Sequence, residues 1–177
     1  MSDNRKRIVF SVAILAASLC FAVIVVSGLY GYRLNTTDSV PVGIYQQTND
    51  PRADYIAFCP TQEQIRIANE RKYRHRSVVC ADGFAPLVKP IRARSGDTVT
   101  VSKQGISVNG TMLLNSTAKR LDGQGRPLPV IPYGVYTVTP NTVWVVSSYN
   151  PASFDSRYFG PVSLTRIISY AKPIWTF

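Results

Sequence analysis

An uncharged, apolar run from Ile8 to Tyr30 constrains the fold of this chain more than any other feature of its sequence. As an α-helix, the run would be about 35 Å long, slightly more than the hydrocarbon thickness of a bilayer, about 30 Å. It is longer than the apolar core of a cleaved signal peptide, and no clear small-x-small cleavage site follows it. We therefore expect residues 8–30 to be an uncleaved transmembrane anchor, with a cleaved signal peptide as the alternative.

The charges in front of the run predict its orientation. Arg5, Lys6 and Arg7 precede it, and positive residues beside a span favour the cytoplasmic side of the membrane. Residues 1–7 are accordingly predicted to be cytoplasmic. Residues 31–177, long enough for one domain with its own core, are predicted to lie in the periplasm, anchored to a bacterial inner membrane.

The net charge of the chain indicates which partners to expect. Its formal charge is +10, and a basic surface beside a membrane most simply meets anionic lipid headgroups. Membrane lipid is therefore an expected partner. A nucleic acid partner would require the cationic run at residues 71–76 to face the cytoplasm, contrary to the predicted orientation, and is not expected.

Two cysteines, Cys59 and Cys80, lie in the predicted exported domain, whereas Cys20 lies in the apolar run. In an oxidising compartment such a pair is more often bridged than free, so the two are a disulfide candidate, with free thiols as the alternative. A metal site would need more ligands than this pair and His75, the only histidine. We expect neither a metal nor another cofactor.

Beyond the anchor, the sequence predicts short β segments and one short helix. Residues 61–73 have a helical pattern that begins at a capping residue, Thr61, with Gln64 three positions later. Asn109-Gly110 is a strong hairpin signal, and residues 119–132, rich in Gly and Pro, are expected to be an exposed loop of open role. The expected fold class is mainly β: an antiparallel β domain on a single transmembrane helix. The expected strands are residues 54–58, 87–91, 98–101, 106–108, 111–114, 142–148 and 164–177.

Two side chains could carry covalent chemistry. Ser39 lies in the run SVPVGIY, and Lys89 is flanked by apolar residues on both sides. A serine hydroxyl is a poor nucleophile until a base accepts its proton, and a lysine can be that base only if burial lowers its pKa. His75 is surrounded by cations that would oppose an imidazolium, which argues against a histidine triad. From the residues alone, Ser39 could also be a turn serine and Lys89 an edge-strand lysine that reaches water.

Four segments resemble, in the same order, the sequence boxes of bacterial type I signal peptidases: residues 39–41, 89–97, 108–110 and 153–162. Within that family the chain is similar to the TraF-type branch of conjugative transfer, whose nucleophile box reads N-x-T-x-S-x-P-x-G-x-Y. The residues that fill this pattern are Asn35, Thr37, Ser39, Pro41, Gly43 and Tyr45. The resemblance implies a signal-peptidase-like β domain.

The resemblance also implies roles for individual residues. Ser39 corresponds to the nucleophile, Lys89 to its general base, and Ser153 to the serine that hydrogen-bonds the lysine amine. The backbone N–H of Ser39 is the expected first oxyanion donor. The Thr37 hydroxyl is a candidate for the second, with a structural role in the turn as the alternative.

Asp155 and Arg157 correspond to a charged pair that braces the site. A carboxylate in contact with the lysine would stabilise its charged form, so we expect Asp155 to pair with an arginine instead. Pro90 stands where the family usually has an arginine after the lysine, so Arg92 and Arg94 are further candidate partners of Asp155.

The implied function is a membrane-anchored serine endopeptidase with a Ser/Lys dyad that processes an exported precursor. By resemblance, the substrate is a pilin precursor and the partners are components of a conjugation or secretion machinery. The acyl-enzyme could react with water or with a peptide amine, which would give ligation or cyclisation. The alternative is a non-catalytic, anchored β-domain assembly subunit, which would explain the basic surface but not the combined motifs.

Overall fold

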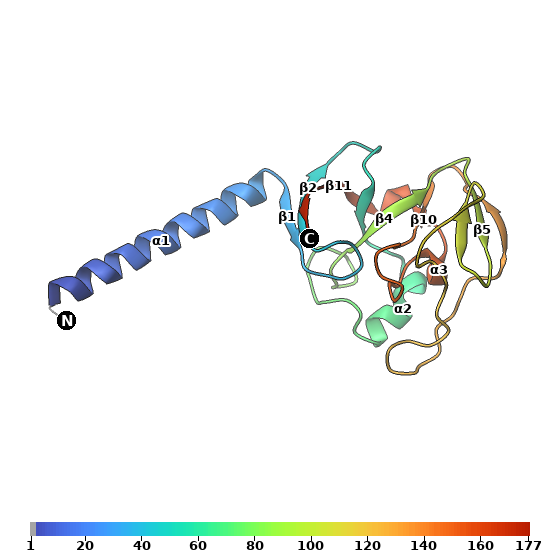
Figure 1. Ribbon diagram of the computed structural model, residues 1–177, viewed down its shortest axis with the longest axis horizontal. Helices are drawn as coiled ribbons and strands as arrows, with labels where there is room; N and C mark the ends of the chain where they lie inside the picture. Colours follow the sequence, from blue (N-terminus) through green and yellow to red (C-terminus); the bar gives the residue numbers. More distant parts are fainter. Residues whose placement is uncertain (1–2) are drawn as a thin grey trace.

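The computed structural model describes residues 3–177, so Met1 and Ser2 of the predicted cytoplasmic segment lie outside the described residues. The N-terminal helix α1 (Asp3–Leu29) projects away from a β domain (Figure 1). Its part from Arg5 to Leu29 is long and apolar enough to cross a membrane, and it is not buried against the rest of the chain. A helix that is apolar on all sides and has no protein partner is a candidate membrane anchor.

Within residues 3–177, the larger of two antiparallel sheets contains seven strands. The C-terminal strand β11 lies between β2 and β3 in this sheet and pairs with both. It therefore joins the N-terminal hairpin β1–β2 to the strands that form the middle of the domain. In spatial order the strands are β1 (Tyr32–Asn35), β2 (Gly43–Thr48), β11 (Ile167–Thr176), β3 (Tyr55–Phe58), β4 (Leu87–Ala93), β9 (Thr142–Val145) and β10 (Val162–Ser163).

A smaller sheet lies at the end of the domain remote from α1, where Figure 1 labels β5. One core lies between this sheet and the ends of β4 and β9, where Trp144 packs with Val99 and Ile106. A second core packs on the large sheet around Ile56 and Phe58. The strands of the smaller sheet, in spatial order, are β7 (Thr111–Met112), β6 (Ile106–Val108), β5 (Thr98–Val101) and β8 (Gly134–Thr137).

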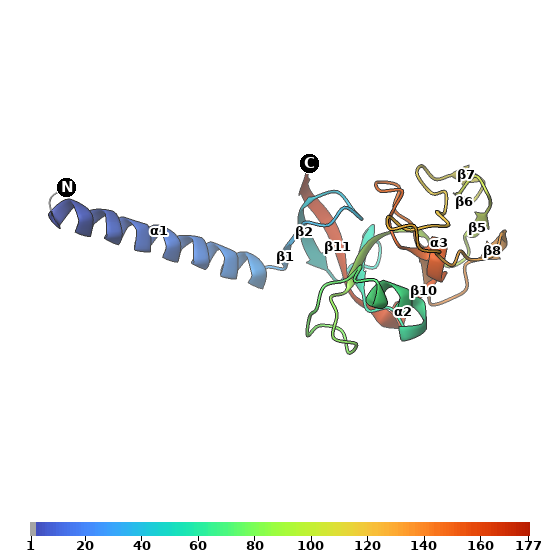
Figure 2. The same ribbon diagram turned by 90° about the horizontal axis from the view of Figure 1, so that it is seen from below.

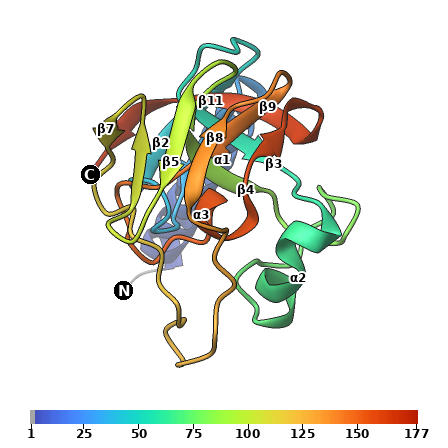
Figure 3. The ribbon, with the colours of Figure 1, turned by 90° about the vertical axis from the view of Figure 1, so that its right-hand side faces the viewer.

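Helix α2 (Gln62–Glu70) begins at the predicted capping box, in which Thr61 and Gln64 bond each other's backbone N–H groups. The helix is shorter than the predicted range 61–73 because Lys72 adopts a left-handed conformation, φ 61°, which an α-helix cannot continue through. A second, single-turn helix α3 (Ser156–Phe159) follows Asp155, whose side chain accepts a hydrogen bond from the backbone N–H of Arg157. Figure 3 shows α2 and the loop of residues 119–132 projecting from the sheets on the same side.

The mainly β, antiparallel fold expected from the sequence is confirmed, and the Asn109-Gly110 turn joins β6 to β7 with positive φ at both residues. Two expectations about the strands were wrong. The first strand is β1 at Tyr32, not a strand at residue 54, and the C-terminal segment begins with a 3-10 turn (Leu164–Arg166) before β11. Four strands, β1, β2, β8 and β10, were not expected from the sequence. The first is a polar edge strand and the second lies between it and β11, so the extended form of both depends on this pairing.

Candidate active site

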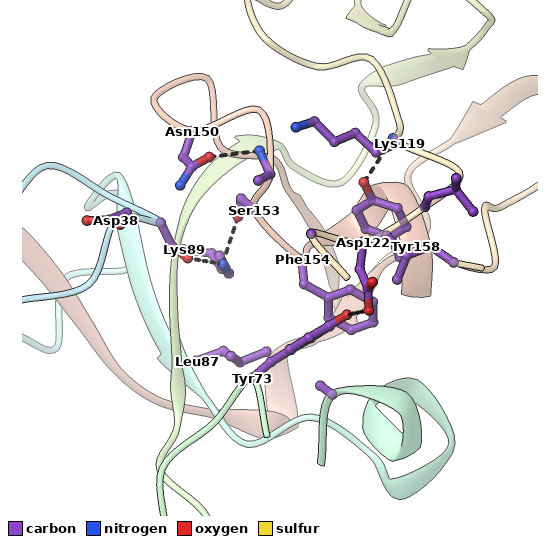
Figure 4. A pocket seen from close by; sticks show the side chains of 16 residues that line it. Asp38, Tyr73, Leu87, Lys89, Lys119, Asp122, Asn150, Ser153, Phe154 and Tyr158 are labelled. Carbon is purple, nitrogen blue, oxygen red and sulfur yellow. Dashed lines mark hydrogen bonds between the residues drawn. The ribbon is translucent and has the colours of Figure 1, made fainter. Parts of the chain in front are cut away.

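Ser39, Lys89 and Ser153 lie together although they come from three distant segments. The Nζ atom of Lys89 is 2.6 Å from Oγ of Ser39 and 2.8 Å from Oγ of Ser153. Figure 4 shows Lys89 and Ser153 at the cavity, with the hydrogen bonds of the lysine amine drawn as dashed lines. The lysine side chain is only 2% exposed. These contacts give the amine two hydroxyl partners and very little access to water.

Strand β4 carries Lys89 into this position. β4 lies between β3 and β9 inside the large sheet, and Lys89 is opposite Ile56 of β3. Its neighbours in β4, Pro90 and Ile91, are buried as well. The edge-strand alternative for Lys89 is therefore wrong, because the strand has a partner on both sides and its amine points into the protein.

Burial is the main influence on the charge of Lys89. Removing the amine from water lowers the pKa of Lys89 from 10.5 to about 8. The negative charge of Asp155 opposes this shift, and the positive charge of Arg157 adds to it. At pH 8 about half of the lysines would be neutral and able to accept a proton.

Asp155 and Arg157 form a fully buried pair beneath the site. Nε and Nη2 of Arg157 each donate to one carboxylate oxygen of Asp155 at 2.8 Å, and neither side chain is exposed. Arg92 and Arg94, the other candidate partners, donate to backbone carbonyl groups instead. The arginine partner of Asp155 is therefore Arg157.

The same arginine also fixes the backbone around Ser153. Its Nη2 atom donates to the carbonyl oxygen of Ser153 at 2.8 Å. Its Nη1 atom donates to the carbonyl oxygens of Asn115, Thr117 and Pro151. Arg157 thereby connects the segment that carries Ser153 to the segment before residue 119.

A single side chain, that of Asn35, organises the loop that carries Ser39. Its Nδ2 donates to the carbonyl oxygens of Thr37, Val40 and Pro41. Its Oδ1 accepts from the backbone N–H of Thr37 and, at 2.7 Å, from the Thr37 hydroxyl. The Thr37 hydroxyl is thus used within the turn, which agrees with the structural alternative for this residue and not with an oxyanion role.

The remaining positions of the nucleophile box close the base of this loop. The Tyr45 hydroxyl donates to the carbonyl oxygen of Pro41 at 2.8 Å. Gly43 lies against the C-terminal strand, so a Cβ atom there would come within 2.1 Å of the carbonyl oxygen of Trp175. Only glycine fits at this contact. Asn35, Thr37 and Tyr45 thus each use their side chains to hold the loop, Gly43 is required by a close contact, and Pro41 contributes its carbonyl oxygen.

A cavity of about 400 Å³ opens beside Ser39 and Lys89. Its far wall is the loop of residues 119–132, whose role the sequence left open. Asp122 in that loop accepts hydrogen bonds from Arg71 and from the hydroxyl of Tyr73 at the end of α2 (Figure 4). The other side chains of the wall include Leu87, Leu121, Leu128, Phe154 and Tyr158.

Other predicted features lie outside this cavity. Cys59 and Cys80 form a disulfide between the end of β3 and the loop after α2. His75 is exposed on that loop. In the part of the chain that the structure describes, no group of three or more His, Cys, Asp or Glu side chains is placed to hold a metal ion.

An antiparallel β domain on an apolar helix, with a serine hydroxyl against a buried lysine amine, defines the class of signal-peptidase-like proteins. Residues 5–176 match the family model described as signal peptidase, peptidase S26, and the chain belongs to this family. The family resemblance expected from the four sequence boxes is thereby confirmed.

The chain is similar to several curated relatives. A plasmid transfer protein TraF of Escherichia coli is 38% identical over 157 residues, covering 84% of this chain and 85% of the relative. A second TraF from the same species is 35% identical and covers 100% of both chains. The conjugal transfer protein TraF of Agrobacterium tumefaciens is 36% identical over 83% of this chain and 84% of its own.

Among solved structures, a signal peptidase I of Enterococcus faecalis aligns with 70% of this chain and 97% of its own. The TM-score is 0.37 and the sequence identity is 19%.

Proposed function

We propose that the protein is a membrane-anchored serine endopeptidase in which Ser39 is the nucleophile and Lys89 the general base. The observation that supports this most strongly is the 2.6 Å contact between a serine hydroxyl and a buried amine whose pKa is lowered to about 8. A neutral amine at this distance can accept the hydroxyl proton as Oγ attacks a peptide carbonyl.

The other site residues support the same chemistry. The Ser153 hydroxyl orients the amine without the charge that a carboxylate would bring. The backbone N–H of Ser39 is the proposed donor to the oxyanion of the tetrahedral intermediate. The protonated Lys89 then returns its proton to the leaving amine, and the acyl group remains on Ser39 as an ester.

The fate of the ester defines the product. Attack by water releases a linear carboxylic acid, whereas attack by a peptide amine gives a ligated or cyclic product. We propose an exported precursor as the substrate, bound as an extended strand with small side chains before the scissile bond. The names of the relatives favour a role in conjugative plasmid transfer. Within that role we propose a pilin precursor as the substrate and the transfer machinery as the partner.

The proposed location follows from the anchor. With α1 crossing the inner membrane and Arg5 to Arg7 in the cytoplasm, residues 31–177 would face the periplasm. The disulfide between Cys59 and Cys80 is consistent with an oxidising compartment. The cavity would then be available to precursors that emerge from the membrane.

The test is to process candidate pilin precursors with the full chain in membranes and to follow product mass. Ser39→Ala and Lys89→Ala are expected to abolish processing, whereas Lys119→Ala, an exposed lysine at the same cavity, retains it. A product lighter than the linear chain by one water indicates cyclisation. Normal processing by Ser39→Ala and Lys89→Ala would instead favour the non-catalytic assembly subunit.

A further inference from the structure

The loop between α2 and β4, residues 71–86, is a projection whose purpose the proposed chemistry does not explain. We call it the finger loop. In Figures 1 and 2 it is the green loop that extends from α2 back toward the end of the domain where α1 joins. It contains the cationic run of residues 71–76 that the sequence analysis singled out.

The finger loop is firmly braced. Cys80 is bonded to Cys59 at the end of β3. The buried guanidinium of Arg74 pairs with Asp82 at 2.6 Å and also donates to the carbonyl oxygen of Ala85. Arg76 lies over the ring of Phe84 at 4.5 Å, across a β-bridge between the same two residues. These contacts fix the conformation of the finger loop, and its tip at Val78 and Val79 therefore projects from the domain.

This braced tip presents two valines to solvent. Val78 is 100% exposed and Val79 is 56% exposed. Arg76 is exposed two residues before Val78, and Lys72 and His75 are exposed earlier in the same loop. Apolar side chains bordered by cations are the combination that binds a bilayer surface, because the apolar groups enter the acyl boundary and the cations meet anionic headgroups.

The position of the tip favours a membrane as its binding partner. Figure 2 shows the finger loop and the C-terminus at the end of the domain that α1 joins. The C-terminus carries exposed Trp175 and Phe177, and aromatic residues of this kind favour the bilayer interface. If α1 spans the membrane, as the proposed function requires, the finger loop is tethered within reach of the headgroups.

We propose that the tip of the finger loop, Val78 and Val79 with the cations beside them, binds the anionic surface of the bilayer that α1 spans. The domain then has two attachments to the membrane, the covalent one through α1 and a second through the finger loop. Two attachments restrict the tilt of the domain, and they thereby fix the height and direction of the Ser39 cavity above the bilayer.

The test places a fluorescent amino acid at one position at a time in the full chain, reconstituted into vesicles that contain lipids with a quencher on the acyl chain. Position 78 reports the tip. Val135 on β8, 70% exposed and at the far end of the domain, is the matched control, and Val23 in α1 reports the anchor. We expect quenching at 78 at least twice that at 135 in vesicles with anionic phosphatidylglycerol, and a decrease toward the level at 135 in vesicles of neutral phosphatidylcholine.

The outcomes separate this inference from the proposed function. Quenching at 23 with none at 78 beyond the level at 135 would overturn the second attachment and leave the anchor intact. Absence of quenching at 23 would overturn the anchor, and with it the basis of both proposals. If the fluorescence at position 78 changes only when another membrane protein is present, and not in vesicles of lipid alone, the partner of the tip is a protein and the lipid assignment is overturned.

A charge variant sharpens the test. Arg76→Gln is expected to lower the equilibrium constant for tip contact about fivefold, the effect of removing one charge near an anionic surface. Lys103→Gln, an exposed cation beside β5 in the small sheet, is the matched control and should leave quenching at 78 unchanged. Equal quenching at 78 in both variants and in the parent chain would contradict an electrostatic contact.

Discussion

Lys89 and Ser39 face each other across 2.6 Å, but the two regions that hold them are built differently. Lys89 lies on a strand with a partner on each side, above a buried ion pair and with almost no exposure. Ser39 lies in the loop between the edge strand β1 and its neighbour β2, held mainly by the side chain of Asn35. The base is positioned by the core, whereas the nucleophile is positioned by a few hydrogen bonds near the surface.

Substitutions in the two regions should therefore affect stability and activity differently. Changes beneath Lys89 should damage stability and activity together, because the same buried groups support both. Changes around Ser39 should damage activity with a much smaller loss of stability, because few buried groups depend on the loop.

The largest effect is expected beneath the base. Arg157→Met leaves Asp155 buried without its partner and leaves four carbonyl groups without their donor, and breaking a buried pair costs about 3–5 kcal/mol. Chemical denaturation of the detergent-solubilised protein should show this loss. Arg66→Met breaks an exposed pair on α2 and should change stability little. Similar midpoints for the two variants would contradict the bracing role.

Replacing the base should raise stability while it removes activity. Because the pKa of Lys89 is lowered from 10.5 to about 8, the folded protein binds fewer protons than the unfolded chain between those values. Stability should therefore rise as pH rises through this window, and the cost of the buried charge, about 3 kcal/mol, is fully present below it.

Lys89→Met removes that cost. We expect the variant to be inactive, more stable than the parent at pH 7 by up to about 3 kcal/mol, and without the rise in stability between pH 8 and pH 10.5. Denaturation midpoints measured across this range provide the test. A variant less stable than the parent at pH 7, with an unchanged pH dependence, would show that the amine is a structural cation.

On the nucleophile side, Asn35→Ala should lower the rate of Ser39 acylation about tenfold, with a loss of stability of only about 1–2 kcal/mol. The loop loses both its amide donor and its amide acceptor, and Ser39 is no longer held against Lys89. Gln47→Ala removes an amide bonded to Ser169, away from the site, and should leave the rate unchanged. Equal rates for the two variants would show that strand pairing alone positions Ser39.

The smallest effect is expected at the cavity wall. Asp122→Asn weakens the ion pair of the loop 119–132 with Arg71 and the ion pair with Arg126 inside the loop. The loop should move more freely, so KM should rise a few-fold while kcat stays close to that of the parent. Precursors with a larger side chain before the scissile bond should gain relative to the normal one. A fall in kcat with unchanged KM would place Asp122 in the chemistry instead.

The contrast also explains what the sequence could predict. The apolar neighbours of Lys89 distinguish it from the other lysines, and the family resemblance implies its role, whereas the Asn109-Gly110 hairpin is predicted because its turn is local. β1 and β2 were missed because polar strands become extended only by pairing with each other and with β11, whose residues come more than a hundred positions later. Asp122 and Arg71 were missed because paired charges and solvated charges look alike in a sequence.

The most direct test of the dyad is acylation of Ser39 by an activated ester, followed across pH by mass spectrometry of the peptide that carries the adduct. We expect a single adduct on Ser39, formed at a rate that rises with pH through a midpoint near 8 as Lys89 loses its proton. The adduct should be absent in Lys89→Ala. An adduct that forms at the same rate in that variant, or on another serine, would contradict the assignment of Lys89 as the base of Ser39.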